Sequence, residues 1–95
     1  MSPQSLAHGK VLVGLGANCP GPWGTPLETL RRALCELERR GVKLLGVSEL
    51  YETAALGPAG QAPYINAVAL VDTNLSALAL LRLLKQIEAA GARNT

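Results

Sequence analysis

The order of hydrophobic patterns along the chain constrains its fold most. A short apolar run, Lys10–Ala17, precedes an amphipathic helix pattern. Two further strand patterns, Val42–Tyr51 and Tyr64–Asp72, and a second helix pattern from Ser76 to about Gly91 follow. This order is that of the ferredoxin-like α+β sandwich, βαββα(β), with the last strand absent. We expect the first and third strands to be central and parallel, and Lys10–Ala17 to be an open edge.

The first helix has the clearest start and stop signals. Thr25 is placed to cap the helix, Pro26 suits its first position, and Glu28 can close a capping box with Thr25. Gly41 ends the helix. The apolar stripe of this helix consists of Leu27, Leu30, Leu34 and Leu37. We therefore expect one face of the helix to pack on the sheet.

Length and composition indicate one small domain with an aliphatic core. The chain has 95 residues, which we divide into a flexible tail at residues 1–9 and a domain at residues 10–95. Hydrophobic residues make up 48% of the chain, yet it has no Phe, one Trp and two Tyr. The net charge of +2 does not favour nucleic-acid binding, and we interpret the arginines of the first helix as a solvated face. No apolar run reaches membrane-spanning length.

The cysteine and histidine content does not favour a metal centre. Cys19 and Cys35 form no CxxC motif, and the single histidine, His8, lies in the tail. No secretory signal is recognisable before Lys10, so we expect a cytoplasmic protein in which both cysteines are reduced and fill space.

Two glycine-containing segments have some features of phosphate-binding loops. GLGAN, residues 14–18, has Cys19 where a dinucleotide-binding fingerprint needs its last glycine, and no helix begins directly after it. GPWGT, residues 21–25, contains no lysine for a phosphate. Neither segment predicts a nucleotide site.

The loop between the second and third strands is the best candidate for a ligand pocket. LYETAALGPAGQAPYINAV, residues 50–68, is too long for a tight hairpin and too apolar for a simple linker. Tyr51, Thr53, Tyr64 and Asn66 lie where the flanking strands meet this loop. By spacing alone, the tyrosines could equally pack on the sheet while Asn66 caps a turn.

The end of the second helix carries one acidic and one basic candidate. Glu88 and Arg93 could be an acid and a phosphate-binding base, or a surface carboxylate and a terminal arginine. The other candidates for metal ligands, Glu49, Glu52 and Asp72, form no closely spaced pair. We therefore predict no metal site in these residues.

Four segments together resemble one enzyme family. They are GLGAN after the first strand, SELYETAALGP before the loop, PYINAV after it and IEAAGAR at the end of the second helix. In this order and spacing, from about Val11 to Arg93, they are similar to 6-hydroxymethyl-7,8-dihydropterin pyrophosphokinase of folate biosynthesis. The resemblance implies transfer of pyrophosphate from ATP to the hydroxymethyl group of the pterin, with two Mg²⁺ ions.

The resemblance implies a pterin site built from five residues. Thr53, Ala54 and Leu56 would line it through backbone and apolar contacts. Tyr64 would cover the ring, and Asn66 would hydrogen-bond its amide-like edge. The pterin is therefore the expected small-molecule partner.

On the nucleotide side the resemblance is incomplete. Glu88 matches an acidic, nucleotide-binding helix position, and Arg93 matches the first catalytic arginine of a mobile loop that closes over ATP. Ala54 stands where the family often has proline. The family's next segment supplies a tryptophan, a second arginine and a DLD strand whose aspartates hold Mg²⁺, and these 95 residues contain no counterpart. We therefore expect weak ATP and Mg²⁺ binding and an inactive isolated chain, because pyrophosphoryl transfer depends on positioning and charge neutralisation.

Two non-catalytic functions remain open at this point. One is an assembly module that forms homo-oligomers through the Lys10–Ala17 edge. The other is a regulatory domain that binds the pterin without using ATP.

Overall fold

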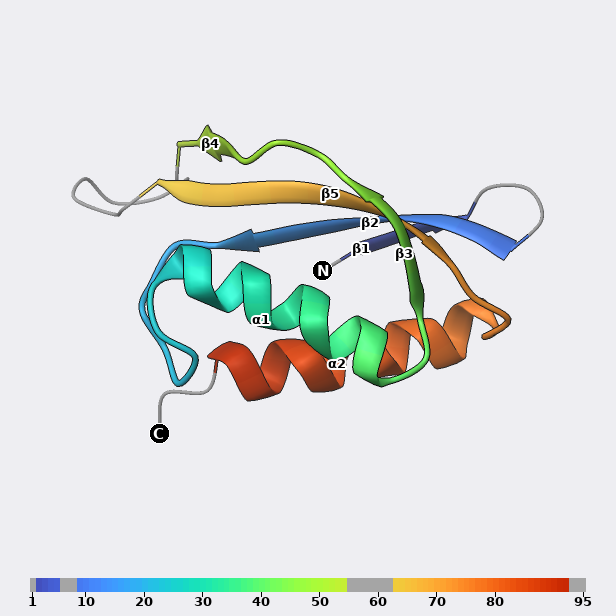
Figure 1. Ribbon diagram of the computed structural model, residues 1–95. Helices are drawn as coiled ribbons and strands as arrows, with labels where there is room; N and C mark the ends of the chain where they lie inside the picture. The colour runs from blue at the N-terminus through green and yellow to red at the C-terminus, as the bar shows by residue number, and fades with distance from the viewer. Residues whose placement is uncertain (1, 6–8, 55–62, 93–95) are drawn as a thin grey trace.

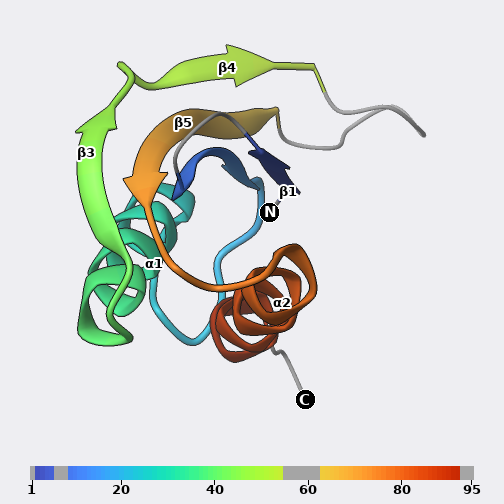
Figure 2. The ribbon, with the colours of Figure 1, turned by 90° about the vertical axis from the view of Figure 1, so that its right-hand side faces the viewer.

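The computed structural model describes residues 2–5, 9–54 and 63–92, which form one sheet with two helices on one of its faces (Figure 1, Figure 2). The elements, in chain order, are β1 (Ser2–Ser5), β2 (Lys10–Ala17), α1 (Pro26–Arg39), β3 (Lys43–Val47), β4 (Tyr51–Thr53), β5 (Tyr64–Asp72) and α2 (Ala77–Ala92). This architecture confirms the predicted ferredoxin-like α+β class.

The central strand of the sheet is β5, which lies between β2 and β3. The strand order is β1-β2-β5-β3, and β4 also pairs with β5. Every pairing is antiparallel, so the expectation of parallel central strands is wrong. The crossover through α1 makes β2 and β3 run in the same direction, and β5 fits between them in the opposite direction.

The open edge expected along β2 is partly covered. Ser2–Ser5 form β1, which pairs with β2 from Ser2 opposite Gly14 to Ser5 opposite Val11. These four residues, which we expected in a flexible tail, form a strand, and Pro3 is compatible with β1 because an edge strand tolerates a missing N–H. On this side of β2, Lys10 and Leu15–Ala17 have no strand beside them among the described residues. Association of two chains through this shorter edge stays a prediction.

The capping signals of α1 are confirmed. The Thr25 hydroxyl accepts a hydrogen bond from the N–H of Glu28 at 3.2 Å, and the Glu28 carboxylate accepts one from the N–H of Thr25 at 3.0 Å. The bonds from Thr25, together with the charge of Arg31, lower the pKa of Glu28. Gly41 follows the helix at φ +88°, a conformation that favours glycine.

The strand predicted over Val42–Tyr51 is broken in two. A register shift between Leu44 and Gly46 interrupts β3, and the chain leaves the ladder before it returns as β4. Ser48 bridges the gap: its N–H donates to the carbonyl of Val68, and its hydroxyl accepts from the N–H of Val68, both at 2.8 Å. The break lets two short strands pair with successive parts of β5.

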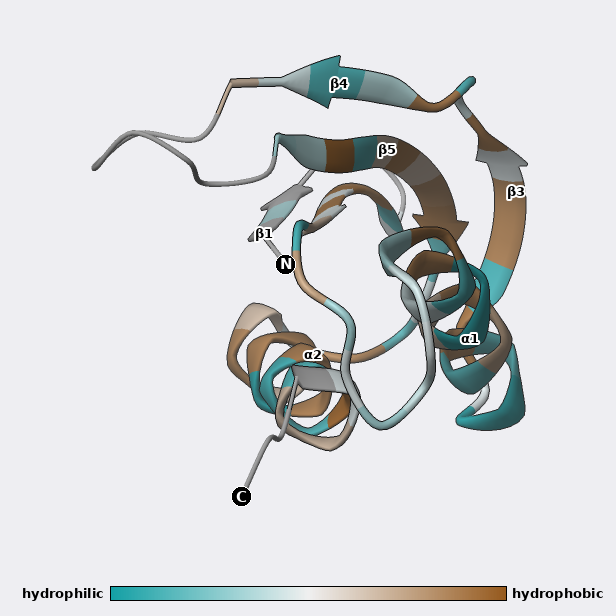
Figure 3. Cartoon of the chain, turned by 90° about the vertical axis from the view of Figure 1, so that its left-hand side faces the viewer, coloured by the Kyte–Doolittle hydropathy of each residue, from teal (hydrophilic) through white to brown (hydrophobic). Residues whose placement is uncertain are grey.

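The core between the sheet and the helices is aliphatic, as predicted. Its buried hydrophobic residues are Val11, Val13, Leu15, Leu30, Ala33, Leu37, Val42, Ala67, Ala69, Val71, Leu80, Leu84 and Ile87. Ser76 caps α2, since its hydroxyl accepts from the N–H of Ala79 at 3.1 Å. Polar residues gather on the outer side of α1 (Figure 3). Within the described part of the chain, no helix is both long and apolar enough to span a membrane.

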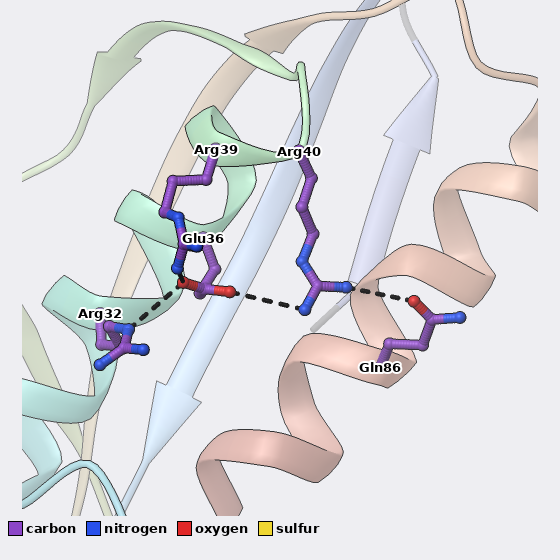
Figure 4. A network of polar contacts seen from close by, with 5 residues as sticks. All are labelled: Arg32, Glu36, Arg39, Arg40 and Gln86. Atoms are coloured by element: carbon purple, nitrogen blue, oxygen red, sulfur yellow. Dashed lines mark hydrogen bonds and ion pairs between the residues drawn. The ribbon is translucent and has the colours of Figure 1, made fainter.

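An ion-pair network joins the two helices (Figure 4). The Glu36 side chain is only 8% exposed and accepts from Arg39 at 2.7 Å, Arg32 at 3.3 Å and Arg40 at 3.5 Å. Arg40 also donates to the side-chain oxygen of Gln86 at 3.1 Å. Burial raises the pKa of Glu36, but the hydrogen bonds and charges of Arg39 and Arg32 outweigh it, so the pKa is lowered. These arginines are therefore more than a solvated face.

Candidate functional site

The pairing of β4 with β5 gathers the polar candidates on one face of the sheet. Thr53 lies opposite Tyr64, and Tyr51 lies opposite Asn66. Because alternate residues of a strand face the same side, all four lie on the face away from the helices. The Asn66 side-chain N–H₂ donates to the Thr53 hydroxyl at 2.9 Å and to the carbonyls of Tyr51 and Tyr64, both at 3.2 Å. Asn66 therefore ties the two strand ends together.

Gly16 of the GLGAN segment lies directly beside this group. In the β2–β5 register it is opposite Asn66. A β-carbon at Gly16 would stand 2.9 Å from Oδ1 of Asn66 and 3.6 Å from Cδ1 of Tyr64. The segment thus has glycine at this position because the Asn66 carboxamide occupies the space of a side chain. The sequence pattern did not indicate this role.

A cavity of about 250 Å³ opens where β2 ends, between the two helices and the loop at residues 18–24. Its walls are Leu15, Gly16, Ala17, Asn18, Cys19, Pro20, Gly21, Trp23, Thr29, Leu30, Ala33, Tyr64, Ile87, Glu88 and Gly91. Tyr64 reaches this cavity from β5 and Glu88 reaches it from α2. Two candidates that are distant in the sequence therefore share one cavity.

The remaining predicted site residues lie elsewhere. Thr53 and Ala54 are exposed at and just after the end of β4, and they do not line this cavity. Leu56 and Arg93 lie outside the described residues. Tyr64 alone belongs both to the cavity wall and to the polar group around Asn66.

The charges around the cavity do not fit a magnesium centre. The described residues contain no group of three or more His, Cys, Asp or Glu side chains that could hold a metal ion. Glu88 is the one carboxylate in the described wall of the cavity. Glu52 lines a separate hollow with Leu27 and Ile65, and Asp72 lies at the other end of β5 opposite Lys10. We therefore derive no step through Mg²⁺ from these residues.

Of the cavity wall, sequence reasoning predicted only Tyr64 and Glu88, and Trp23 and Thr29 are among the residues that it missed. Trp23 packs against Gly91, and the Arg32 guanidinium lies 5.1 Å from the centre of its ring. The side-chain oxygen of Thr29 is buried and has no hydrogen-bond partner among the residues that the structure describes. A lone tryptophan in a Gly-Pro loop was a visible signal of packing. Thr29, one turn before the core residue Ala33, could have been placed on the inner side of α1 from helical spacing.

The fold is an α+β sandwich, and its cavity is lined mostly by apolar and aromatic residues with a few polar ones. Such a lining is typical of small-molecule sites. The family model of 7,8-dihydro-6-hydroxymethylpterin-pyrophosphokinase matches residues 12–95, and the chain belongs to this family. The resemblance stated from the four sequence segments is thereby confirmed.

Relatives in three bacteria agree with this assignment, and all three are named 2-amino-4-hydroxy-6-hydroxymethyldihydropteridine pyrophosphokinase. The protein of Pseudomonas aeruginosa is 42% identical over 80 residues, which are 83% of this chain and 47% of the relative. That of Pseudomonas putida is also 42% identical over 80 residues, with 62% of the relative covered. That of Haemophilus influenzae is 39% identical over 77 residues, covering 80% of this chain and 46% of the relative. The chain spans about half the length of two of these relatives.

Proposed function

We propose that this chain provides the pterin-binding part of a pyrophosphokinase of folate biosynthesis. The reaction would transfer pyrophosphate from ATP to the hydroxymethyl group of 6-hydroxymethyl-7,8-dihydropterin. The observation that carries the proposal is the position of Tyr64, which joins the polar group around Asn66 to the cavity that Glu88 also lines.

The chemistry of these side chains suits a flat, polar heterocycle. The Tyr64 side chain, with the residue 39% exposed, offers a ring face that could cover the pterin. The Asn66 carboxamide, held by Thr53 and two carbonyls, would present Oδ1 to the donors of the pterin edge. Such fixed polar groups discriminate strongly, because a ligand with the wrong edge leaves buried groups unpaired.

The nucleotide side would use Glu88, and the family resemblance adds Arg93. We propose that the purified 95-residue chain binds the pterin and does not turn over ATP. Pyrophosphoryl transfer depends on positioning and on charge neutralisation by metal ions and arginines. A single carboxylate in the described cavity wall supports this view.

Titration calorimetry with 6-hydroxymethylpterin tests the binding part. We expect measurable binding by the wild-type chain and a loss of about tenfold or more for Tyr64→Leu, since aromatic contacts beyond simple burial are removed. Leu78→Ala is the matched control, because Leu78 is exposed at the far end of α2 and its replacement should leave pterin binding unchanged. The absence of heat with wild type, or equal weakening in both variants, would count against the proposal.

Steady-state ATP consumption with the pterin and Mg²⁺ tests the rest. Pterin binding without turnover supports a non-catalytic chain, whereas turnover above background refutes the proposed inactivity. The second candidate function, a pterin-binding module that does not use ATP, predicts the same pterin affinity with and without the nucleotide.

A further inference from the structure

Residues 21–24 form a tight turn immediately before α1. The N–H of Gly21 donates to the carbonyl of Gly24 at 3.0 Å, and the N–H of Gly24 donates to the carbonyl of Gly21 at 2.9 Å. This pairing places Pro22 and Trp23 at the tip, and Gly24 has φ +106°. Thr25 follows as the cap of α1, so the turn and the helix are joined without a flexible link.

The turn packs against the last turn of α2 at two points. A β-carbon on Gly91 would stand 2.6 Å from Cε3 and Cζ3 of the Trp23 ring. A β-carbon on Gly21 would stand 2.8 Å from the carbonyl oxygen of Gly91. Figure 1 shows the loop after β2 beside the C-terminal end of α2. Both glycines therefore permit an approach that any side chain would prevent.

Trp23 also contacts α1. The Arg32 guanidinium lies 5.1 Å from the ring centre, within the range of a cation–π interaction. The single tryptophan of the chain thus contacts the end of one helix and the middle of the other. Its position is defined by the tight turn, by Arg32 and by Gly91.

The last turn of α2 has little stability of its own. It contains Gly91, which is among the poorest helix formers, and its described residues include no basic side chain to interact favourably with the C-terminal end of the helix dipole. Helix ends of this kind open locally unless tertiary contacts hold them. Glu88 lies three residues before Gly91 and lines the same cavity as Trp23.

We propose that Trp23 is a positioning residue that holds the last turn of α2 against α1 and thereby sets the place of Glu88 in the cavity. Trp23 acts through Gly91 and need not touch the ligand. The consequence for ligand binding rests on the proposed function, whereas the ordering of α2 does not.

Amide hydrogen exchange of the ligand-free protein tests whether Trp23 orders the last turn of α2. For Gly91→Ala, the direction in which the exchange rate at residues 87–91 changes decides the question. Alanine is the better helix former, so without a docked ring it would slow exchange at residues 87–91 about fourfold. If Trp23 occupies the space, the added methyl displaces the ring, and exchange there becomes faster. Slower exchange in Gly91→Ala would overturn the proposal.

Trp23→Ala and Trp23→Phe provide the second measurement. We expect Trp23→Ala to accelerate exchange at residues 87–91 about tenfold while residues 80–84 change little. Trp23→Phe should restore most of the protection, and Leu78→Ala, at the other end of α2, should change neither region. The same acceleration in both regions of α2 would show general destabilisation and would contradict the proposed role.

Ligand binding completes the experiment. We expect Trp23→Ala to weaken the binding of 6-hydroxymethylpterin about threefold to tenfold, with Trp23→Phe close to wild type, because a displaced α2 end alters the cavity. Local exchange that responds as described, with no pterin binding by wild type, would reject the proposed function and retain the positioning role. Pterin binding by wild type, with no local change in exchange in either variant, would reject the positioning role alone.

Discussion

The Asn66 carboxamide fills the space that a side chain at Gly16 would need, on the face of the sheet away from the helices. A β-carbon on Gly16 would stand 2.9 Å from Oδ1 of Asn66, a separation too short for an unstrained contact. The carboxamide cannot rotate away without loss, because its N–H₂ group is bonded to Thr53 and to two carbonyls. The glycine of GLGAN and the asparagine of PYINAV are therefore one structural unit, although they lie on different strands.

Gly16→Ala should weaken pterin binding about tenfold, because the added methyl displaces the carboxamide that would bind the ligand. Calorimetry with 6-hydroxymethylpterin measures the effect. Gly46→Ala is the matched control, since a β-carbon on this strand glycine would meet no described group within 4 Å. Equal affinities of the two variants would mean that Asn66 does not contact the pterin.

Asn66→Asp should loosen the junction of β4 with β5. The substitution replaces a donor of three hydrogen bonds by a carboxylate that faces a hydroxyl and two carbonyl oxygens. We expect a loss of roughly 1 kcal/mol in the free energy of unfolding, measured with urea, because these bonds are at the surface. Exchange of the Tyr51 and Thr53 amides should accelerate more than that of β2. Unchanged stability at neutral pH would contradict the bridging role of Asn66.

The parts of the fold that could be predicted from the sequence are those specified by neighbouring residues. The start of α1 depends on Thr25, Pro26 and Glu28, which interact within a single helical turn, and its end depends on Gly41. The pairing of β1 with β2 was not predictable in this way. Ser2–Ser5 have no alternating apolar pattern, and their strand forms by pairing with β2 rather than through contacts among these four residues.

The candidate site was predictable to a similar extent. The gathering of Thr53, Tyr64 and Asn66 follows from two strands that meet at one loop, and the family resemblance named the same residues. The contact of Trp23 with Gly91 depends on how the ends of two helices pack, which no local pattern specifies. Prediction therefore failed where residues distant in the sequence meet through tertiary packing.

Glu36 should make the stability of the protein depend on pH below about 4.5, the ordinary carboxyl pKa. Its folded-state pKa is lowered, despite burial, by the hydrogen bonds and charges of Arg39 and Arg32. Its contribution is therefore fully present above the unfolded-state pKa and is lost as the pH falls through the folded-state pKa. We expect the free energy of unfolding, measured with urea from about pH 7 down to about pH 3, to fall less for Glu36→Gln than for wild type.

Glu38→Gln is the control for this measurement, because Glu38 is an exposed glutamate of the same helix. The free energy of unfolding of Glu38→Gln should fall with pH as steeply as that of wild type. Added salt should reduce the difference between wild type and Glu36→Gln, since Arg32 and Arg39 are half or more exposed. Identical pH profiles of Glu36→Gln and wild type would contradict the effect of the arginines on Glu36.

Replacing Thr25, the cap of α1, and Thr29, within α1, by valine should change the free energy of unfolding in opposite directions. The Thr29 hydroxyl is buried and bonds to none of the described residues, so Thr29→Val should raise the free energy of unfolding by about 1 kcal/mol. The Thr25 hydroxyl caps α1, so Thr25→Val should lower it by about 1 kcal/mol. Urea denaturation of both variants is the measurement. Destabilisation by Thr29→Val would indicate that the hydroxyl bonds an ordered water in solution.

The two cysteines should report directly on occupancy of the cavity. Cys19 lines the cavity and is exposed, whereas Cys35 is exposed on α1 away from its wall. With 6-hydroxymethylpterin at about ten times its dissociation constant, mass action predicts about a tenfold slower reaction of Cys19 with iodoacetamide. Cys35 should react at an unchanged rate. The single-thiol variants Cys35→Ser and Cys19→Ser let mass spectrometry follow each rate separately. If the pterin binds but slows neither thiol, it occupies another surface, and the cavity between β2, α1 and α2 is not its site.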